Sequence, residues 1–157
     1  MRKIIIFGNS GSGKSTLAAE LRGEGLAHLD LDALAWLPSH PPKRRPINEA
    51  DEKIQNFTRE NDEWIVEGCY ADLLELVKPL ATEAIFLNLP VHMCQKNAMN
   101  RPWEPHKYAS KKAQDDNLVM LLDWIAEYMI RKDSLSYAAH RRLYKRFVGK
   151  KTEIRCN

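Results

Sequence analysis

Cysteine is scarce in this sequence, and long hydrophobic runs are absent. The three cysteines, Cys69, Cys94 and Cys156, are odd in number and never spaced as C-x-x-C. This argues against a disulfide framework and against a zinc site, so we interpret them as free thiols. No segment approaches the roughly 18 consecutive apolar residues that a membrane span needs. The start, MRKIIIFGNS, passes from a short apolar run straight into glycine, unlike a secretory signal, and we expect a cytoplasmic protein.

The composition is that of a soluble globular protein. Hydrophobic residues make up 44% of the 157 residues and charged residues 29%. A chain of this length buries one substantial core but is too short for two ordinary domains. We therefore expect residues 1–157 to form a single domain, and the sequence leaves its oligomeric state open.

The net charge of +3 is unevenly distributed along the chain. Residues 131–157 contain nine lysines or arginines against two acidic residues, an excess of seven positive charges. Such a region either attracts phosphate, of a nucleotide or of DNA, or forms a solvated helix face without a partner. Both interpretations stay open at this point.

Apolar, β-branched runs alternate along the chain with segments of helical spacing. Strand-like runs cover residues 3–7, 26–31, 64–67, 84–89 and, more weakly, 151–156. Helical spacing is found in residues 14–24, 48–61, 71–80 and 91–101. Strands that alternate with helices imply β-α-β crossovers and a mostly parallel sheet with helices on both faces. The expected fold class is α/β.

Two stretches interrupt this alternation. Residues 37–46 hold four prolines and three consecutive basic residues, which predicts a loop or an extended connector. A polar segment that contains Pro102 and Pro105 precedes residues 118–147, which we expect to form one long helix or two consecutive ones. A helical stripe supports this expectation, and its members are Leu118, Leu121, Leu122, Ile125 and Met129. Trp124 and Tyr128 border the stripe, and we interpret both as core or core-edge residues.

The stretch GNSGSGKS at residues 8–15 matches G-x-x-x-x-G-K-[ST] at every fixed position, after an expected strand and at the start of an expected helix. Its glycines let successive backbone N–H groups converge on one anion, and the helix adds the positive end of its dipole. Lys14 would reach the β and γ phosphates, and the hydroxyl of Ser15 would coordinate Mg²⁺. The expected nucleotide-binding residues are Gly8, Asn9, Ser10, Gly11, Ser12, Gly13, Lys14, Ser15 and Thr16.

Other motifs of nucleotide-binding proteins are missing. No N-K-x-D stretch is present for guanine recognition, and no D-x-x-G switch. No apolar strand ends in aspartate to serve as a Walker B carboxylate, because Asp51 and Asp62 both follow polar residues. These absences argue against a GTPase and against a helicase-type motor, but the preference for ATP over GTP is not decided by them.

The second expected strand ends in HLDLDALAW, which places Asp30 and Asp32 two residues apart. In an extended strand both side chains leave on the same side, and ligands of open parallel sheets bind beyond the carboxyl ends of the strands. Two neighbouring carboxylates repel each other unless a cation or a proton lies nearby. We expect Asp30 to support Mg²⁺ and Asp32 to orient or deprotonate an acceptor hydroxyl. The alternative is that the two acids only cap the following helix.

GNSGSGKST, HLDLDALAW, WIVEGCY and IFLNLP, followed by a helix that ends at Arg101, resemble the P-loop small-molecule kinases of the shikimate kinase and adenylate kinase group. The resemblance is greater to the bacterial proteins called DNA topology modulation proteins, and it covers nearly the whole chain in order. It implies a P-loop NTPase fold with a five-stranded parallel sheet in the order 2-3-1-4-5. It also implies an acceptor-binding segment at residues 33–63 and a lid at residues 101–117.

The resemblance further implies roles for individual residues. Trp36, Glu67 and Gly68 would face the acceptor, with Gly68 permitting a close backbone approach or a positive φ. Arg101 would begin the lid and lie over the base or contact phosphates, and Arg131 is a candidate for reaching the transferred phosphate. The alternatives are an ordinary strand-to-helix turn at Glu67–Gly68 and a solvated helix arginine at position 131.

The sequence therefore predicts a cytoplasmic kinase-like phosphotransferase that uses ATP and Mg²⁺ on a small acceptor. Its expected catalytic residues are Lys14, Asp32, Arg101 and Arg131. A second hypothesis is a nucleotide-binding regulator of DNA topology that acts through the basic region. A third is a degenerate kinase fold that binds nucleotide without turnover.

Overall fold

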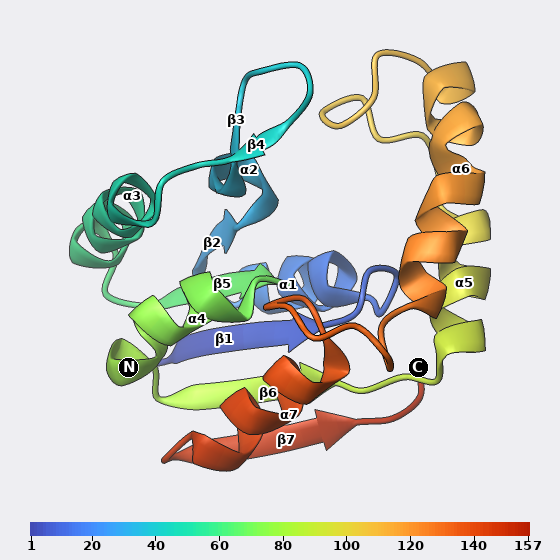
Figure 1. The fold of residues 1–157 in the computed structure, drawn as a ribbon. Coiled ribbons are helices and arrows are strands. Elements are labelled where there is room, and N and C mark those ends of the chain that lie inside the picture. The colour runs from blue at the N-terminus through green and yellow to red at the C-terminus, as the bar shows by residue number, and fades with distance from the viewer.

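The computed structural model describes residues 1–157 as a three-layered α/β domain around one main sheet (Figure 1). The sheet has five parallel strands in the order β2-β5-β1-β6-β7. Numbered among themselves, these strands follow the expected order 2-3-1-4-5. The strands are β1 (Lys3–Gly8), β2 (Ala27–Asp30), β5 (Trp64–Gly68), β6 (Glu83–Leu87) and β7 (Lys150–Ile154).

Helices cover both faces of the sheet, because the central strands β1, β5 and β6 are apolar on both sides. One core packs Phe7 and Val66 against α3 (Ile47–Glu60), α4 (Ala71–Val77) and α7 (Tyr137–Arg146). The other packs Ile4 and Ile6 against α1 (Lys14–Arg22), α5 (Val91–Met99) and α6 (Lys111–Ala126). The expected α/β class is therefore confirmed.

A small arm stands above the carboxyl end of β2. It consists of the short helix α2 (Asp32–Ala35) and an antiparallel pair of two-residue strands, β3 (Trp36–Leu37) and β4 (Lys43–Arg44). The expectation of a connector over residues 37–46 did not include this pairing. Arg45 supports the arm, since its backbone N–H donates to Ala35 O at 2.8 Å and its Nε donates to Leu34 O at 2.8 Å.

Of the two alternatives for residues 118–147, one long helix or two consecutive ones, the structure has two helices, with bounds that differ from the expected range. α6 already begins at Lys111, capped by the Ser110 hydroxyl, so only the first part of the expected lid is irregular. The chain leaves helical structure after Ala126 and re-enters it at Tyr137. Met129, expected on the buried stripe, is 57% exposed for this reason.

One short connection completes the list of elements. A single 3-10 turn, η1 (Lys78–Leu80), follows α4 and leads into β6.

None of the helices combines the length and the apolar character that crossing a membrane requires. The free cysteines expected from the sequence are present as free thiols, with Cys94 buried and Cys156 exposed.

Candidate active site

The glycine-rich loop connects the end of β1 to the first turn of α1, as the motif requires. Gly11 and Gly13 have φ of 78° and 95°, which is left-handed backbone that favours glycine. A Cβ on Gly11 would lie 2.3 Å from the carbonyl oxygen of Cys94, so no larger residue fits there. Lys14 Nζ donates to Asn9 O at 2.7 Å and is thereby held over the loop. The backbone is shaped to cradle phosphate.

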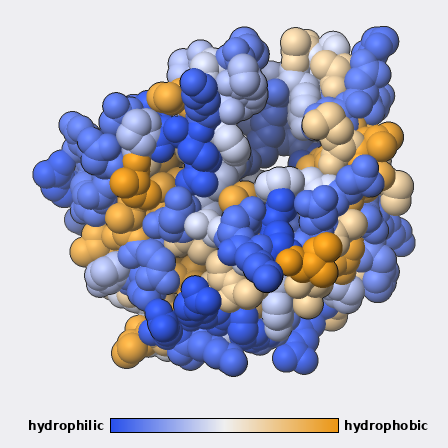
Figure 2. Space-filling view, viewed as in Figure 1, coloured by the Kyte–Doolittle hydropathy of each residue, from blue (hydrophilic) through white to orange (hydrophobic).

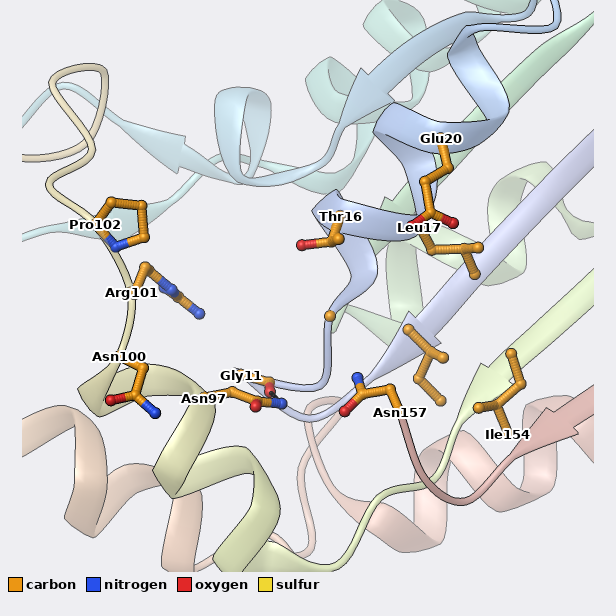
Figure 3. Close-up of a pocket in the computed structure, with 12 residues that line it drawn as sticks. Gly11, Thr16, Leu17, Glu20, Asn97, Asn100, Arg101, Pro102, Ile154 and Asn157 are labelled. Atoms are coloured by element: carbon orange, nitrogen blue, oxygen red, sulfur yellow. Dashed lines mark hydrogen bonds between the residues drawn. The ribbon is translucent and has the colours of Figure 1, made fainter.

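A cavity of about 500 Å³ opens on one side of this loop (Figure 3). Arg101 and Pro102 line one wall, and Leu17, Leu87 and Ile154 supply apolar surface. The amide of Asn97 donates to Gly11 O at 2.9 Å and fixes the loop from α5. Sequence analysis missed Asn97, because an asparagine inside a helix carries no motif.

A second cavity, of about 430 Å³, lies between the glycine-rich loop, the arm and the irregular segment that starts at Arg101. Figure 2 shows the hollow at the top of the view. Of the expected catalytic and acceptor-binding residues, Lys14, Asp32, Trp36, Glu67, Gly68 and Arg101 all line it. Arg131 and Asp30 do not. The structure thus brings together most of the expected site residues, which come from five different elements or connections.

The carboxylate beside Ser15 is that of Glu67. The Ser15 hydroxyl donates to Glu67 Oε1 at 3.0 Å, and His28 Nε2 lies 3.2 Å from the same oxygen. Glu67 is only 2% exposed, and it is the penultimate residue of β5, the strand that pairs with β1. The search for an apolar strand that ends in aspartate missed it, although the apolar run Trp64–Val66 directly precedes this glutamate.

Asp30 and Asp32 were expected to project from one extended strand, and this expectation is wrong. β2 ends at Asp30, and Asp32 already belongs to α2, whose start is held by the hydrogen bond from Asp32 N to Asp30 Oδ1 at 2.9 Å. The helix start turns the two side chains apart, so that Asp32 reaches the cavity and Asp30 does not. Burial, together with the Glu67 and Asp32 carboxylates, raises the pKa of Asp30.

Asp32 is held by groups from both sides of the cavity. Its Oδ1 accepts from the Tyr70 hydroxyl at 2.5 Å, and its Oδ2 accepts from Lys107 Nζ at 3.1 Å. Lys107 belongs to the irregular segment after Arg101, so this segment contacts the arm directly. Arg101 forms an ion pair with Glu104 at 3.1 Å within the same segment. Tyr70 and Lys107 were not among the expected site residues.

Gly68 is needed for close approach, not for a positive φ. The φ of Gly68 is not positive. A Cβ on this residue would, however, lie 2.9 Å from Leu31 Cβ. Leu31 is fully buried and begins the turn into α2. The glycine therefore lets β5 pass close beneath the arm that carries Asp32.

Comparison with solved structures identifies the fold. The deoxyadenosine kinase from M. mycoides, solved with bound dATP, is 14% identical to this chain. The superposition covers 98% of this chain and 90% of the kinase, with a TM-score of 0.50. The chain has a P-loop kinase-like fold. A sugar kinase from Janibacter sp. HTCC2649 is 15% identical over 85% and 82% of the two chains, with a TM-score of 0.49. The shikimate kinase from Bacteroides thetaiotaomicron is 15% identical over 92% and 97%, at 0.43. No family model and no curated protein sequence matches the chain.

Two expected features lie away from the cavities of this P-loop kinase-like fold. The Arg131 guanidinium is stacked on Trp124, 3.3 Å from the ring centroid, and lies beside Glu127 and Asp133. Part of the positive charge of residues 131–157 is neutralised by Glu153, which pairs with Arg141 at 2.8 Å and with Arg155 at 2.9 Å. The exposed cations of this region on α7 are Arg142, Lys145 and Arg146. A DNA partner stays a prediction.

Proposed function

We propose that this protein is a phosphotransferase that moves the γ-phosphate of Mg²⁺-ATP to a hydroxyl group of a small acceptor. The observation that carries the proposal is the composition of the 430 Å³ cavity. It joins a phosphate-binding loop to an ionised carboxylate, Asp32, and to two cationic lid residues, Arg101 and Lys107. A nucleotide-binding domain without transfer chemistry needs only the loop.

The transfer step uses these groups as follows. The acceptor oxygen attacks the γ phosphorus, the bond from that phosphorus to the β–γ bridging oxygen breaks, and ADP leaves. The hydroxyl proton passes to the Asp32 carboxylate, which acts as general base. Lys14 neutralises charge on the β and γ phosphates and Arg101 adds a planar cation from the lid. Arg131 takes no part in this proposal, since its guanidinium is stacked on Trp124 outside the cavity.

The residues around Ser15 fit a magnesium ion that is shared with the nucleotide. A hydroxyl and two neighbouring carboxylates, Glu67 and Asp30, provide the hard oxygen ligands that Mg²⁺ prefers. No group of three or more His, Cys, Asp or Glu side chains forms a complete metal site, as expected where phosphates supply the remaining ligands. Bound there, the ion would neutralise phosphate charge. Ser15 and Glu67 would hold it, with Asp30 behind them.

The lid has a separate task. The ion pair of Lys107 with Asp32 joins the lid to the arm at 3.1 Å, and both residues line the cavity. Closure of such a segment excludes water, so that phosphate is transferred to the acceptor and not to water. An acceptor hydroxyl that reaches Asp32 competes with Lys107 for the same carboxylate, which couples acceptor binding to the lid.

The test is ADP release from Mg²⁺-ATP by the purified protein, with nucleosides, nucleoside monophosphates, polyols such as shikimate, and DNA offered in turn. We expect one small acceptor to stimulate release and Lys14→Ala to abolish the stimulation with the fold intact. Lys111→Ala is the matched control, because Lys111 is exposed and pairs only with Asp115. Turnover that is unchanged in Lys14→Ala, or stimulation by DNA alone, would refute the proposal.

A further inference from the structure

The charges that line the 430 Å³ cavity leave no cation free for an anionic acceptor. Outside the glycine-rich loop the cavity is lined by two cations, Arg101 and Lys107. Arg101 pairs with Glu104 at 3.1 Å, and Lys107 lies 3.1 Å from Asp32 and 3.6 Å from Glu104. Lys14 belongs to the phosphates of the nucleotide. A carboxylate or second phosphate on the acceptor would therefore enter a site whose positive charge is already compensated.

Aromatic side chains make up much of the remaining wall. Four of them line the cavity, each from a different part of the chain: Trp36, Tyr70, Tyr108 and Trp124. The nucleotide base does not account for these rings, because the other cavity beside the loop, which has apolar surface from Leu17, Leu87 and Ile154, contains none of them.

Trp36 is oriented for a ligand and not for the core. It is 40% exposed, although a tryptophan gains most from full burial. Its indole Nε1 donates to the Tyr70 hydroxyl at 2.9 Å, and that hydroxyl donates to Asp32 Oδ1. Arg44 lies 5.8 Å from the ring and is tied to Asp72 at 3.0 Å. The indole is thus fixed next to the carboxylate that addresses the acceptor hydroxyl.

Trp124 forms part of the wall supplied by α6, across from the arm (Figure 1). The expectation of a core or core-edge residue holds only in part, because Trp124 is 37% exposed and lines the cavity. Its ring is covered on one face by Arg131, 3.3 Å from the centroid. A ring stacked on one face by a guanidinium is held in place while its remaining surface stays available. Leu121 and Leu135 continue the apolar wall.

We propose that the acceptor is an uncharged alcohol that carries a planar heteroaromatic ring, which is the nucleoside class. The ring lies against Trp36 and is enclosed from the α6 side by Trp124, and its hydroxyl group reaches Asp32. This inference rests on the proposed function, and it selects one of the acceptor classes that the phosphotransferase assay compares. The volume of about 430 Å³ is within the usual range for small-molecule sites.

The inference is tested by binding, independently of turnover. Adenosine, guanosine, cytidine and thymidine are titrated by calorimetry into the full-length protein saturated with Mg²⁺-ADP, alongside their 5′-monophosphates and shikimate. We expect at least one nucleoside to bind more tightly than its monophosphate and than shikimate. Trp36→Leu should weaken nucleoside binding roughly tenfold or more, as loss of one aromatic stacking partner does. Trp36→Phe, which keeps a ring, should retain most of it.

Two controls separate a lost stacking surface from a disturbed fold. Leu80→Ala removes an apolar side chain of similar exposure, 42%, that lines neither cavity, and should leave nucleoside binding unchanged. The affinity for ADP should be equal in all these variants. Failure of every nucleoside to bind, equal binding by Trp36→Leu, or tighter binding of a monophosphate or of shikimate overturns the inference.

The outcome can be distinguished from failure of the proposed function. If shikimate or a monophosphate stimulates Lys14-dependent ADP release and nucleosides do not, the phosphotransferase stands and the acceptor class is wrong. If a nucleoside binds in a Trp36-dependent way but no acceptor stimulates ADP release, the binding site stands and the phosphotransferase is wrong.

Discussion

The Tyr70 hydroxyl donates a hydrogen bond to Asp32 Oδ1 at 2.5 Å, and this bond joins the segment after β5 to the start of α2. Burial acts to raise the pKa of Asp32. The Lys107 ammonium and the Tyr70 hydroxyl outweigh it and hold that pKa below its ordinary value. Asp32 is therefore ionised at neutral pH, as a proton acceptor must be. Tyr70 connects Trp36 to Asp32, because its hydroxyl accepts from the indole Nε1 and donates to the carboxylate.

Replacement of Tyr70 by phenylalanine should impair the use of the acceptor and leave nucleotide binding intact. The variant keeps the ring but removes one hydrogen bond to a carboxylate and leaves the indole of Trp36 without its partner. Hydrogen bonds to charged groups contribute about 1.5–3 kcal/mol, so kcat/KM for the acceptor should fall by roughly tenfold or more. Steady-state kinetics with varied acceptor, and ATP affinity by calorimetry, measure the two effects.

Tyr70→Phe is also made in the Asp32→Asn variant. The double variant shows whether Tyr70 acts by orienting the Asp32 carboxylate or whether its loss disturbs the site as a whole. Because Tyr70 is argued to act through the carboxylate of Asp32, Tyr70→Phe should cost much less once that carboxylate is gone. Full additivity of the two losses would show that Tyr70 acts elsewhere.

Glu67→Gln should weaken metal binding without unfolding the protein. The amide keeps a hydrogen-bond acceptor for Ser15 and removes the negative charge of a side chain that is 2% exposed. Mn²⁺ affinity in the presence of ATP, followed by electron paramagnetic resonance, should fall roughly tenfold or more. Asp30→Asn, which changes a carboxylate outside the cavity, should have the smaller effect. The reverse order would assign the metal to Asp30.

The sheet was predictable because its signals are local. Residues 4–7, 64–66 and 84–87 are continuous apolar runs, which is what strands buried on both faces require. The position of the break between α6 and α7 was not predictable, since residues 127–136 contain neither proline nor glycine to mark it. That segment is set by tertiary contacts such as the hydrogen bond from Tyr137 N to Tyr128 O at 3.0 Å.

The glycine-rich loop was predictable for the same reason, because its residues are contiguous and chemically unusual. Asn97, Tyr70 and Lys107 were missed, since each acts on a partner at least 38 residues away. Tyr70 even ends the stretch WIVEGCY, but nothing local shows that its hydroxyl meets Asp32. Glu67 stands in the stretch WIVEGCY, but only the pairing of β5 with β1 brings it to Ser15. Site residues that depend on strand neighbours become visible only with the topology.

Gly68→Ala should destabilise the fold through overpacking beneath the arm. The added Cβ would lie 2.9 Å from Leu31 Cβ and 3.1 Å from Leu31 Cδ1, and Leu31 is fully buried. Overpacking of this kind costs about 1–3 kcal/mol of unfolding free energy, measured by urea denaturation. Gly23→Ala, at an ordinary right-handed helical position that ends α1, is the matched control and should cost less. Equal small losses would mean that the arm moves aside freely.

His140 should make the stability of the protein depend on pH between about 4 and 6.5. The ring is fully buried, Nε2 donates to Cys69 O at 2.7 Å, and Nδ1 lies 2.7 Å from the Tyr128 hydroxyl, which donates to it. Burial lowers the pKa of His140 to about 4, from 6.5 in the exposed chain. In this window the unfolded chain binds a proton that the folded protein does not bind. Stability therefore rises with pH, and the loss at pH 4 relative to pH 7 reaches about 3 kcal/mol.

The contribution of His140 can be isolated from that of the carboxylates by difference. Urea unfolding of the wild type and of His140→Gln is measured at several pH values from 4.5 to 7. The glutamine retains a donor for Cys69 O but does not titrate, so the variant should be less stable at pH 7 and should lose less stability on acidification. His106→Gln, at an exposed position, should follow the wild-type curve. Parallel curves for the wild type and His140→Gln would show that His140 is protonated in the fold despite its burial.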